Sequence, residues 1–298
     1  MNIRKATEHD IPSIVSLLKL SLGEGLIKKS EAMWRWKHIE NPFGESPVLL
    51  AEEGDLLVGV RAFMQWRFSK DGKEYKALRA VDTATHPDHR GKGIFKKLTL
   101  ALIDKVKDEG FDFIFNTPNE QSKPGYLKMG WKELGRLPVR VKPFLFSSRS
   151  SNVIADYSVD ISNCQADQKV KDYWQWRYAD NPLADYYQIV FGQNGIAFFR
   201  IKQSKYFKEL RICDIRLSNK DIPDFKRTIA VAAKSFGCRV ISIGNYPFSL
   251  NASLSKAGFF TPIYRGLMLT GRIVNTDPKD YFSPLDSVDL DLGTFELF

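Results

Sequence analysis

Cysteine is scarce in this chain of 298 residues, and metal-binding patterns are missing. The three cysteines, Cys164, Cys213 and Cys238, are scattered and form no C-x-x-C pair. Their odd number and spacing argue against a disulfide framework and against a cysteine-based zinc site. The histidines and carboxylates suggest no metal cluster either. We therefore expect free thiols, no bound metal and a reducing, cytoplasmic setting.

Long apolar runs are also missing. The first residues, 1–5, lead into charged sequence rather than an apolar stretch, so we expect no secretory signal. No segment approaches the roughly 18 consecutive apolar residues of a membrane helix, and we expect no membrane association. The sequence also lacks a long basic run and any zinc-finger or RRM signature.

The net charge of +9 fits either a basic soluble surface or attraction to a polyanion. Nucleic acid is the less favoured interpretation of this charge, because a phosphorylated cofactor would use a local basic site equally well. Apolar residues make up 43% of the chain, enough for ordinary buried cores. The length favours two domains.

A repeated segment divides the chain. Residues 34–42 read WRWKHIENP and residues 174–182 read WQWRYADNP, which share the pattern W-x-W-[KR]-x-x-x-N-P. Each copy predicts a short aromatic helix that ends near Asn41 or Asn181, because the residue before proline is disfavoured in the α region. The tryptophans are interpreted as packing residues, with an acceptor pocket as the alternative.

The order of predicted elements after the two copies is the same. After the first copy, hydrophobic spacing predicts strands 48–53, 56–67 and 74–85, a helix 92–109, a strand 111–116, a short helix 121–129 and a strand 131–140. After the second copy, it predicts strands 187–191, 196–202 and 206–217, a helix 222–236, a strand 239–243, a short helix 249–257 and a strand 259–269.

The predicted fold is therefore α/β (α+β), with two tandem units that each hold a mixed, mostly antiparallel sheet flanked by helices. We expect domains at 1–145 and 146–275, joined by a polar connection near 145–165. Residues 276–298 are acidic and predict either a tail or an added edge strand.

A glycine-containing turn lies between a predicted strand and helix in the first unit. Gly91 and Gly93 let the backbone approach a ligand and direct several N–H groups into one concavity. The helix that follows adds its positive dipole end, and Arg90, Lys92, Lys96 and Lys97 add charge, so the turn suits a pyrophosphate. A P-loop is excluded because no Gly-Lys-Ser/Thr occurs, and a Rossmann fingerprint lacks its third glycine.

These residues resemble the phosphate turn of the GNAT acetyltransferase superfamily, [QR]-x-x-G-x-[GA]. Arg90 and Gly93 match, and Phe95 departs from the pattern at its last position. The downstream segment 119–131 is similar to the family's short helix, which ends in Tyr-x-Lys-x-Gly-aromatic. The resemblance covers roughly residues 1–140, and tandem GNAT units are known in the superfamily.

The resemblance implies acetyl-CoA as cofactor and an N-acetyltransferase that moves an acetyl group directly to a primary amine. It implies pyrophosphate on the amides of residues 91–95, which include Lys92 and Ile94. It also implies pantetheine beside the strand that ends near Ala84 and Thr85, and an acetyl thioester where strands 77–86 and 111–117 diverge.

Transfer to an amine needs a neutral nucleophile and a proton for the leaving thiolate. Tyr126 matches the family's tyrosine that protonates the thiolate; the alternative is a tyrosine that packs on Trp131. Asp82 is the candidate base, directly or through water, unless it anchors a loop. Strand alternation puts Asp82 and Ala84 on one face.

Four further polar residues lie close to the predicted site. His86 and His89 lie at the phosphate turn, which favours a structural or cofactor role. Asn116 and Asn119 follow the second diverging strand and are predicted to hydrogen-bond pantetheine or to hold the two strands apart.

The corresponding place in the second unit, residues 217–224, has no glycine, and Asp221 and Asp224 would repel phosphate at the helix start. The second unit is therefore interpreted as a degenerate copy that does not bind CoA. The acceptor is predicted to be a small-molecule or peptide amine. The alternatives are a non-catalytic acyl-CoA-binding or scaffold protein and a nucleic-acid-associated protein. The sequence does not indicate an oligomeric state.

Overall fold

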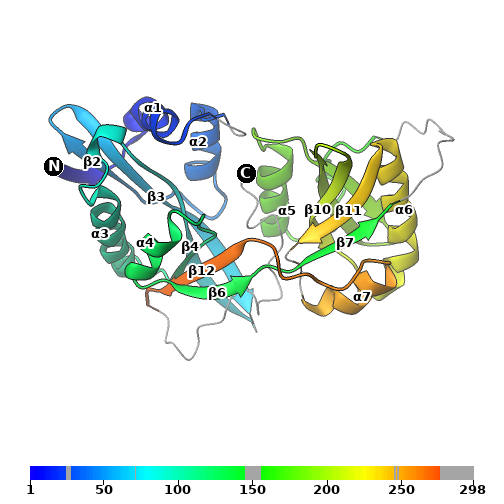
Figure 1. The fold of residues 1–298 in the computed structure, drawn as a ribbon. Helices are drawn as coiled ribbons and strands as arrows, with labels where there is room; N and C mark the ends of the chain where they lie inside the picture. Colours follow the sequence, from blue (N-terminus) through cyan, green and yellow to red (C-terminus); the bar gives the residue numbers. More distant parts are fainter. Residues whose placement is uncertain (25–27, 71, 145–155, 245, 247, 276–298) are drawn as a thin grey trace. The chain divides into compact units, whose positions relative to one another are not determined.

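The protein is described by a computed structural model that covers residues 1–24, 28–70, 72–144, 156–244, 246 and 248–275. Its chain divides into two compact units (Figure 1). Among the described residues, the first unit contains residues 1–135 and the segment from Met268 onward, and the second contains Arg136–Leu267.

The first unit is built on a seven-stranded sheet in the order β1-β2-β3-β4-β5-β12-β6. β4 and β5 are parallel, and the other pairs whose register is described are antiparallel. The strands are β1 (Asn2–Lys5), β2 (Val48–Glu53), β3 (Leu56–Lys70), β4 (Lys73–Thr85), β5 (Phe113–Asn116), β6 (Lys132–Arg136) and β12 (Met268–Ile273). The predicted mixed, mostly antiparallel sheet is confirmed.

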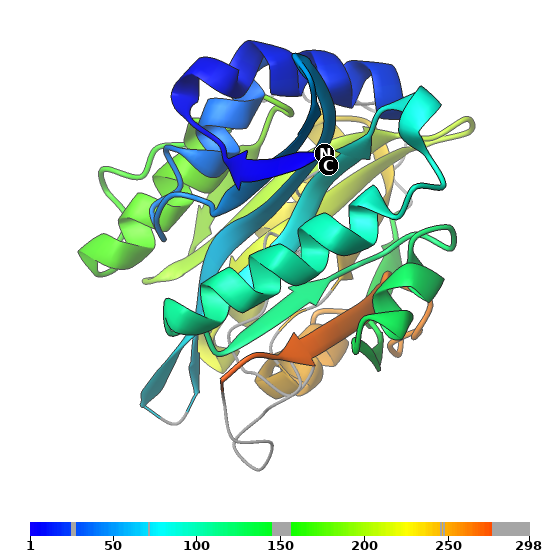
Figure 2. The same ribbon diagram turned by 90° about the vertical axis from the view of Figure 1, so that its left-hand side faces the viewer.

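Helices cover both faces of this sheet. In β2, Leu49 and Ala51 pack with α3, whereas Val48 and Leu50 pack with α1. This period-two alternation gives one strand two buried faces. Figure 2 shows α3 lying along one face of the sheet. The helices are η1 (Glu8–Asp10), α1 (Ile11–Leu22), α2 (Glu31–His38), η2 (Pro87–His89), α3 (Ile94–Asp108) and α4 (Lys123–Lys128).

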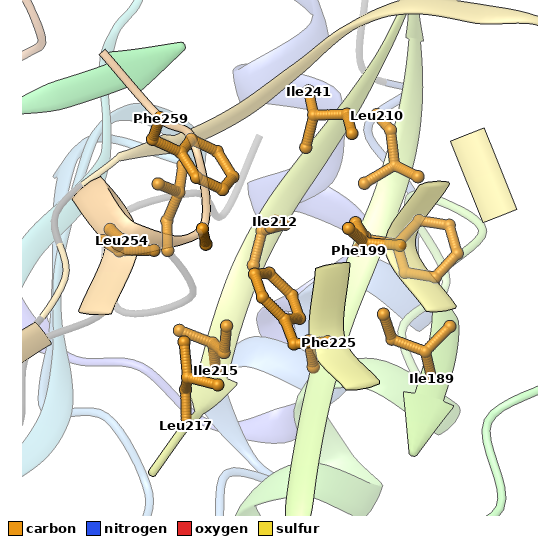
Figure 3. Packing of buried hydrophobic residues seen from close by; sticks show 14 of the residues in the cluster. Ile189, Phe199, Leu210, Ile212, Ile215, Leu217, Phe225, Ile241, Leu254 and Phe259 are labelled. Atoms are coloured by element: carbon orange, nitrogen blue, oxygen red, sulfur yellow. The ribbon is translucent and has the colours of Figure 1, made fainter. Parts of the chain in front are cut away.

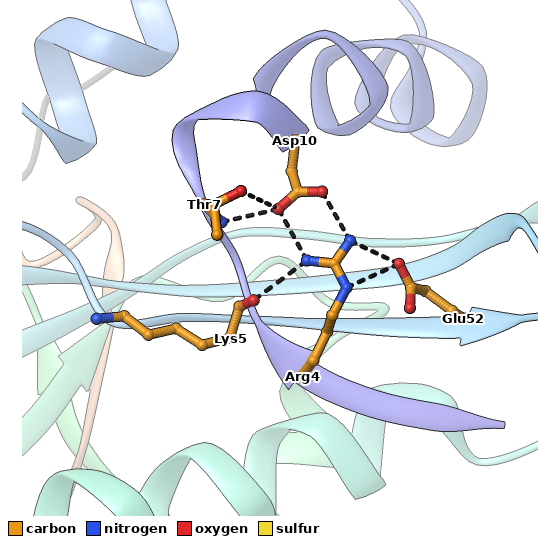
Figure 4. A network of polar contacts seen from close by, with 5 residues as sticks. All are labelled: Arg4, Lys5, Thr7, Asp10 and Glu52. Atoms are coloured by element: carbon orange, nitrogen blue, oxygen red, sulfur yellow. Dashed lines mark hydrogen bonds and ion pairs between the residues drawn. The ribbon is translucent and has the colours of Figure 1, made fainter.

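A polar network joins α1 to the edge of the sheet (Figure 4). The Arg4 guanidinium on β1 donates to Asp10 at 2.7 Å and to Glu52 on β2 at 2.6 Å. Asp10 also accepts from the backbone N–H of Thr7 at 2.8 Å. The hydrogen bond from Arg4 holds the pKa of Asp10 well below its ordinary value. One guanidinium therefore links the first strand, the start of α1 and the second strand.

The second unit has a five-stranded sheet in the order β7-β11-β10-β9-β8. Its core packs Phe225 of α6 against Phe199 and Ile212 of the sheet (Figure 3). The strands are β7 (Val139–Pro143), β8 (Tyr187–Phe191), β9 (Gly195–Gln203), β10 (Lys208–Arg216) and β11 (Cys238–Gly244). The helices are α5 (Gln168–Trp174), the π-helix η3 (Gln175–Ala179), η4 (Asn219–Asp221), α6 (Ile222–Ser235), η5 (Phe248–Leu250) and α7 (Asn251–Lys256).

The two units exchange strands along the chain. β6 ends in the first sheet, and after Leu137 and Pro138 the chain continues as β7 in the second sheet. β12 then returns from the second unit to lie between β5 and β6. The prediction of one strand over 131–140 is therefore wrong, and Pro138, which lacks a backbone donor, lies at the break. The strand predicted at 259–269 begins only at Met268.

This exchange changes the domain boundaries from the predicted linear division at 145/146. Residues 136–144 lie with the second unit, and the segment from Met268 lies with the first. The remaining elements agree with prediction within a few residues. The four tryptophans of the repeat, Trp34, Trp36, Trp174 and Trp176, are buried, which supports the packing interpretation. The predicted tail at 276–298 lies outside the described residues.

No helix within the described part of the chain is long and apolar enough to cross a membrane.

The strand exchange predicts that the stability of the first unit depends on β12. A chain that ends at Leu267 lacks the antiparallel neighbour of β5 and the buried Leu269. We expect this variant to aggregate or to lose part of its cooperative thermal unfolding, measured by circular dichroism. A chain that ends at Asn275 keeps β12 and is expected to unfold at a higher temperature than the chain that ends at Leu267. Equal unfolding midpoints for the two truncations would contradict the prediction.

Candidate active site

A β-bulge interrupts β4 near its carboxyl end. Val81 pairs with Ala62 of β3 and Thr83 pairs with Arg61, which leaves Asp82 as an extra, unpaired residue. Asp82 has φ +42, and it alone among the described non-glycine residues has a positive φ. Aspartate tolerates this left-handed region better than most residues. An extra residue bends a strand and changes which face its side chains occupy.

The change of face can be followed along β4. Before the bulge, Leu78 and Ala80 pack with α3. After the bulge, Ala84 packs with α1 and Trp34 on the opposite face. The Asp82 side chain contacts α2 on that same face. This agrees with the expectation that the side chains of Asp82 and Ala84 lie on one face of the sheet.

The pairing between β4 and β5 ends just before this bulge. Their parallel ladder runs from Ala77 and Phe113 to Arg79 and Phe115. β4 then continues to Thr85 while pairing only with β3 within the described ladders. Residues 80–85, with Ala84 and Thr85 at their end, therefore form an edge not paired with β5. The Thr85 carbonyl accepts from the Ser21 hydroxyl at 3.0 Å.

Asp82 lies in a buried cluster of charged and polar groups. Its Oδ2 accepts from the Lys37 ammonium and from His38 Nε2, the latter at 2.9 Å. His38 Nδ1 lies 2.8 Å from the Ser46 hydroxyl, which fits a neutral imidazole that carries its proton on Nε2. The side chains of Lys37 and His38 are 0% exposed and that of Asp82 is 4% exposed.

Burial and charge set the protonation of this cluster. Burial raises the pKa of Asp82, but Lys37 and His38 more than offset this and hold the pKa well below its ordinary value. Burial lowers the pKa of His38, against the opposing effect of Asp82. Burial likewise lowers the pKa of Lys37, and Asp82 again opposes it. Near neutral pH, Asp82 is therefore ionised and His38 is neutral.

The glycine turn lies between β4 and α3. Gly91 has φ +79 and Gly93 has φ +74, values that suit glycine. A Cβ built on either residue would meet no heavy atom within 4 Å, so the backbone here borders open space. α3 begins directly after it at Ile94, and the first N–H groups of a helix have no intrahelical acceptor. Several donors therefore gather at an open surface.

Gly59 of β3 brings the start of α3 close to the sheet. A Cβ at Gly59 would lie 2.6 Å from Ile94 Cγ2 and 3.0 Å from Leu98 Cδ1. Gly59 pairs with Thr85, the last residue of β4. The absence of a side chain at Gly59 thus sets the start of α3 beside the end of β4.

The basic residues of the turn have protein partners. Arg90 Nη2 donates to the Ser21 carbonyl at the end of α1, at 2.9 Å. Lys92 Nζ lies 3.1 Å from His89 Nδ1 and 3.7 Å from Glu53. In addition, His86 Nδ1 accepts from the Asp88 N–H at 3.3 Å. Arg90 therefore fixes the turn to α1, and the two histidine rings hold its other side.

Tyr126 lies on α4 with its ring against Phe95 of α3, at 5.5 Å between centroids, and against Trp131, at 5.1 Å. Its hydroxyl accepts from Arg61 Nη1 of β3 at 2.8 Å. Phe95 fits because Gly125 leaves room: a Cβ there would lie 3.1 Å from the Phe95 ring. Phe95, which departs from the GNAT turn pattern at its last position, thus contributes to packing around Tyr126.

The two predicted asparagines have structural partners. Asn116 is buried and accepts from the Thr270 hydroxyl of β12. Asn119 Oδ1 accepts from the N–H and the hydroxyl of Ser122, both at 2.9 Å, at the start of α4. Asn116 therefore links β5 to β12, and Asn119 caps the segment that leads into α4. Contact of these asparagines with pantetheine, or a role in holding β4 and β5 apart, stays a prediction.

Sequence reasoning missed four residues of this site. Lys37 and His38 were noticed only as part of the repeated helix, and their position one after the other at its end was the available signal. Arg61 interrupts the apolar run 57–64, which is the pattern of a buried charge. Gly59 in the same run indicates a close backbone approach.

The first unit is similar in sequence to acyltransferase domains. Residues 2–134 match the family described as acetyltransferase (GNAT) domain. The chain is also 42% identical over 64 residues to the L-amino acid N-acyltransferase MnaT of Escherichia coli. It is 41% identical over 61 residues to an L-methionine sulfoximine/L-methionine sulfone acetyltransferase of Salmonella typhimurium. These matches span 22% and 20% of this chain and 36% and 34% of the two relatives.

The fold is similar to solved structures over both units. A GCN5-related N-acetyltransferase from Anabaena variabilis superposes with a TM-score of 0.68 and 17% identity, covering 92% of this chain and 73% of that one. Another from Kribbella flavida has a TM-score of 0.59 and 12% identity, covering 91% and 71%. At these identities the likeness concerns the fold.

The buried cluster predicts a strong effect of Asp82→Asn. The variant removes the carboxylate that Lys37 and His38 contact, and breaking a buried ion pair costs about 3–5 kcal/mol. We expect the thermal midpoint near neutral pH to fall by roughly 6–20 °C. Asp55→Asn, at an exposed turn, is the matched control and is expected to change it little.

The difference in thermal midpoint between wild type and Asp82→Asn should also depend on pH. Because the folded pKa of Asp82 lies below its ordinary value of 3.8, its stabilisation is present above that pH and is lost as the pH falls through the folded pKa. The gap in midpoint between wild type and Asp82→Asn should therefore narrow below about pH 4. A gap that stays constant would argue against an ionised Asp82.

Proposed function

We propose that the chain is an acetyl-CoA-dependent N-acetyltransferase with its active site in the first unit. The observation that carries the proposal is the open glycine turn at the start of α3, beside the edge of β4 that β5 leaves unpaired. A GNAT domain match over the same residues supports it. Tyr126 is the proposed acid on the neighbouring α4.

The turn fits a pyrophosphate on its own geometry. Gly91 and Gly93 leave open space where side chains would stand, and the N–H groups of residues 91–95, including Lys92, Ile94 and Phe95, are the proposed donors. Arg90 acts mainly by fixing the turn to Ser21. Pantetheine is proposed to follow the free edge of β4 near Ala84 and Thr85, with Asn116 and Asn119 maintaining the space.

Acetyl-CoA would supply the thioester, and transfer forms a C–N bond to the amine while the C–S bond breaks. Tyr126 is proposed to give its phenol proton to the departing sulfur. An ionised Asp82 can accept the amine proton, directly or through water. A carboxylate with a strongly lowered pKa is a weak base, however. The contacts of Asp82 with Lys37 and His38 therefore favour a role in which Asp82 anchors α2 to the sheet.

The second unit is proposed to be a degenerate copy without a CoA site. No positive-φ glycine occurs within residues 217–224, all of them described. The β9–β10 ladder leaves Cys213 unpaired, as the β3–β4 ladder leaves Asp82. Beyond that bulge, Phe198 stands where Arg61 stands in the first unit.

The end of α7 matches the end of α4 in its backbone. The Trp131 N–H donates to the Tyr126 carbonyl at 3.2 Å, and the Phe259 N–H donates to the Leu254 carbonyl at 3.0 Å. Gly130 and Gly258 precede these aromatics, both with φ +90. By this correspondence, Leu254 takes the place of Tyr126. Asp82, Arg61 and Tyr126 thus have thiol or apolar counterparts, whereas Lys37 keeps a basic counterpart in the repeat, Arg177.

The proposed acceptor is a primary amine. The names of the two sequence relatives make the amino group of an amino acid the first class to test, and other small-molecule or peptide amines follow. The net charge of +9 is consistent with a phosphorylated cofactor, and nucleic acid is not part of the proposal.

The turn assignment predicts the effect of Gly93→Glu. The added carboxylate should repel pyrophosphate and weaken acetyl-CoA binding about tenfold or more, measured by isothermal titration. Gly110→Glu is the matched control, because Gly110 has φ +76 and open space around its Cβ position but follows the far end of α3. Equal affinities in the two variants would refute the assigned turn.

The acid assignment predicts that Tyr126→Phe lowers the rate of thiol release from acetyl-CoA by about 100-fold or more, with little change in acetyl-CoA affinity. The assay follows free CoA thiol with a panel of L-amino acids and other amines. Tyr206→Phe, at an exposed site, serves as the control. Tight acetyl-CoA binding without thiol release for any amine would favour the binding-protein alternative.

A further inference from the structure

Arg61 is a fully buried cation in the middle of β3. Its side chain is 0% exposed, and its Nε and Nη2 have no hydrogen-bond partner in the structure. No ion pair involves Arg61 among the described residues. Its one polar contact there is the hydrogen bond from Nη1 to the Tyr126 hydroxyl, at 2.8 Å. A buried, unsatisfied donor costs about 1–3 kcal/mol.

Aromatic rings surround this guanidinium. Its central carbon lies 4.8 Å from the ring centre of Phe63, 5.3 Å from Tyr126 and 5.6 Å from Phe95. Cation–π attraction to these rings offsets part of the burial cost. The rings also exclude water, so the charge of Arg61 acts on the Tyr126 oxygen through a medium of low polarity.

The fold does not require an arginine at this place. In the second unit, the residue at the corresponding step beyond the bulge is Phe198, which is 0% exposed. The counterpart of Tyr126 is Leu254, also 0% exposed. The arginine and the tyrosine are thus both present in the unit with the glycine turn and both replaced by apolar residues in the other.

The hydrogen bond also decides what Tyr126 can donate. A phenol has one proton and accepts through its oxygen lone pairs. Arg61 occupies an acceptor position of that oxygen, and no described protein group accepts the Tyr126 proton. The proton therefore stays available for another molecule. When Tyr126 gives it up, the resulting phenolate lies beside the Arg61 cation.

We infer that Arg61 is a positioning residue for proton donation by Tyr126: it orients the phenol and stabilises the phenolate formed when the proton moves to the leaving sulfur. The inference rests on the proposed function. In this step the O–H bond of Tyr126 breaks, an S–H bond forms on the departing thiol, and Tyr126 regains a proton from water after product release. Arg61 itself does not touch the substrate.

The test is a double-mutant cycle of Arg61→Met and Tyr126→Phe, read as kcat for thiol release. Tyr126→Phe should lower kcat about 100-fold or more, and Arg61→Met about 10-fold or more. If Arg61 acts through Tyr126, the double variant should equal Tyr126→Phe alone. KM for acetyl-CoA should change little. Arg61→Lys, which keeps the charge, should recover part of the lost rate.

Thermal unfolding distinguishes positioning from a structural role. Replacing an incompletely satisfied buried cation with an apolar residue of similar length is often neutral or stabilising. We therefore expect Arg61→Met to unfold at the same temperature as wild type or higher, although its kcat is lower. A fall of several degrees would identify Arg61 as a structural residue and overturn the inference.

The remaining outcomes separate the two proposals. If Tyr126→Phe is slow but Arg61→Met is not, or if the two losses multiply, the inference about Arg61 is overturned and the acetyltransferase proposal stands. If Tyr126→Phe leaves kcat unchanged, the acid assignment and the role of Arg61 both fail. Wild-type protein without thiol release for any amine would overturn the proposed function and the inference together.

Discussion

The extra residue in β4 is the constraint on which the rest of the first unit depends. Asp82 can occupy the bulge because an aspartate tolerates φ +42 and because its carboxylate accepts hydrogen bonds from Lys37 and His38 of α2. The ladder with β5 has already ended at Arg79. One irregular residue thus ties the helix of the repeat to the sheet just where β4 gains a free edge.

The neighbouring residues make that edge usable. Gly59 brings the start of α3 to the end of β4, and Arg90 fixes the intervening turn to α1. On this same α3 face of the sheet, Phe95 and Gly125 pack α3 against α4 and set the Tyr126 ring. The departure of Phe95 from the family pattern is therefore compensated by a residue without a side chain on the adjacent helix.

Sequence patterns reach only part of this arrangement. The glycine turn and Tyr126 could be found because their signals are local: positive-φ residues before a helix, and a tyrosine at fixed spacing from a glycine. Asp82 could be placed on a face by alternation. Its partners could not be found, because the contact between Asp82 and Lys37 spans distant parts of the chain. Such pairings depend on how elements pack rather than on neighbouring residues.

The strand exchange was missed for a related reason. The run 131–140 has the composition of a single strand, and β-sheet partners are not encoded in composition. Pro138 was the one local indication that the ladder breaks there. The return of β12 depends on long-range pairing, in which Thr270 meets Asn116 and Leu269 is buried. The sequence could predict that a strand exists near this point but not which sheet it joins.

The comparison of the two units bears on why buried polar groups persist. Both units have a bulge in the second strand of a hairpin, which is β4 in the first unit and β10 in the second. Both also have buried tryptophans and a glycine with φ +90 before an aromatic residue. Both units thus share these features of the fold. The first unit adds Asp82 in the bulge, Arg61 beside it and Tyr126 on α4, each of which needs hydrogen-bond or ionic partners to offset burial. The second unit fills the same places with Cys213, Phe198 and Leu254, which need none. Polar groups that the fold can replace by apolar ones are best explained by chemistry, and they concentrate around the free edge of β4.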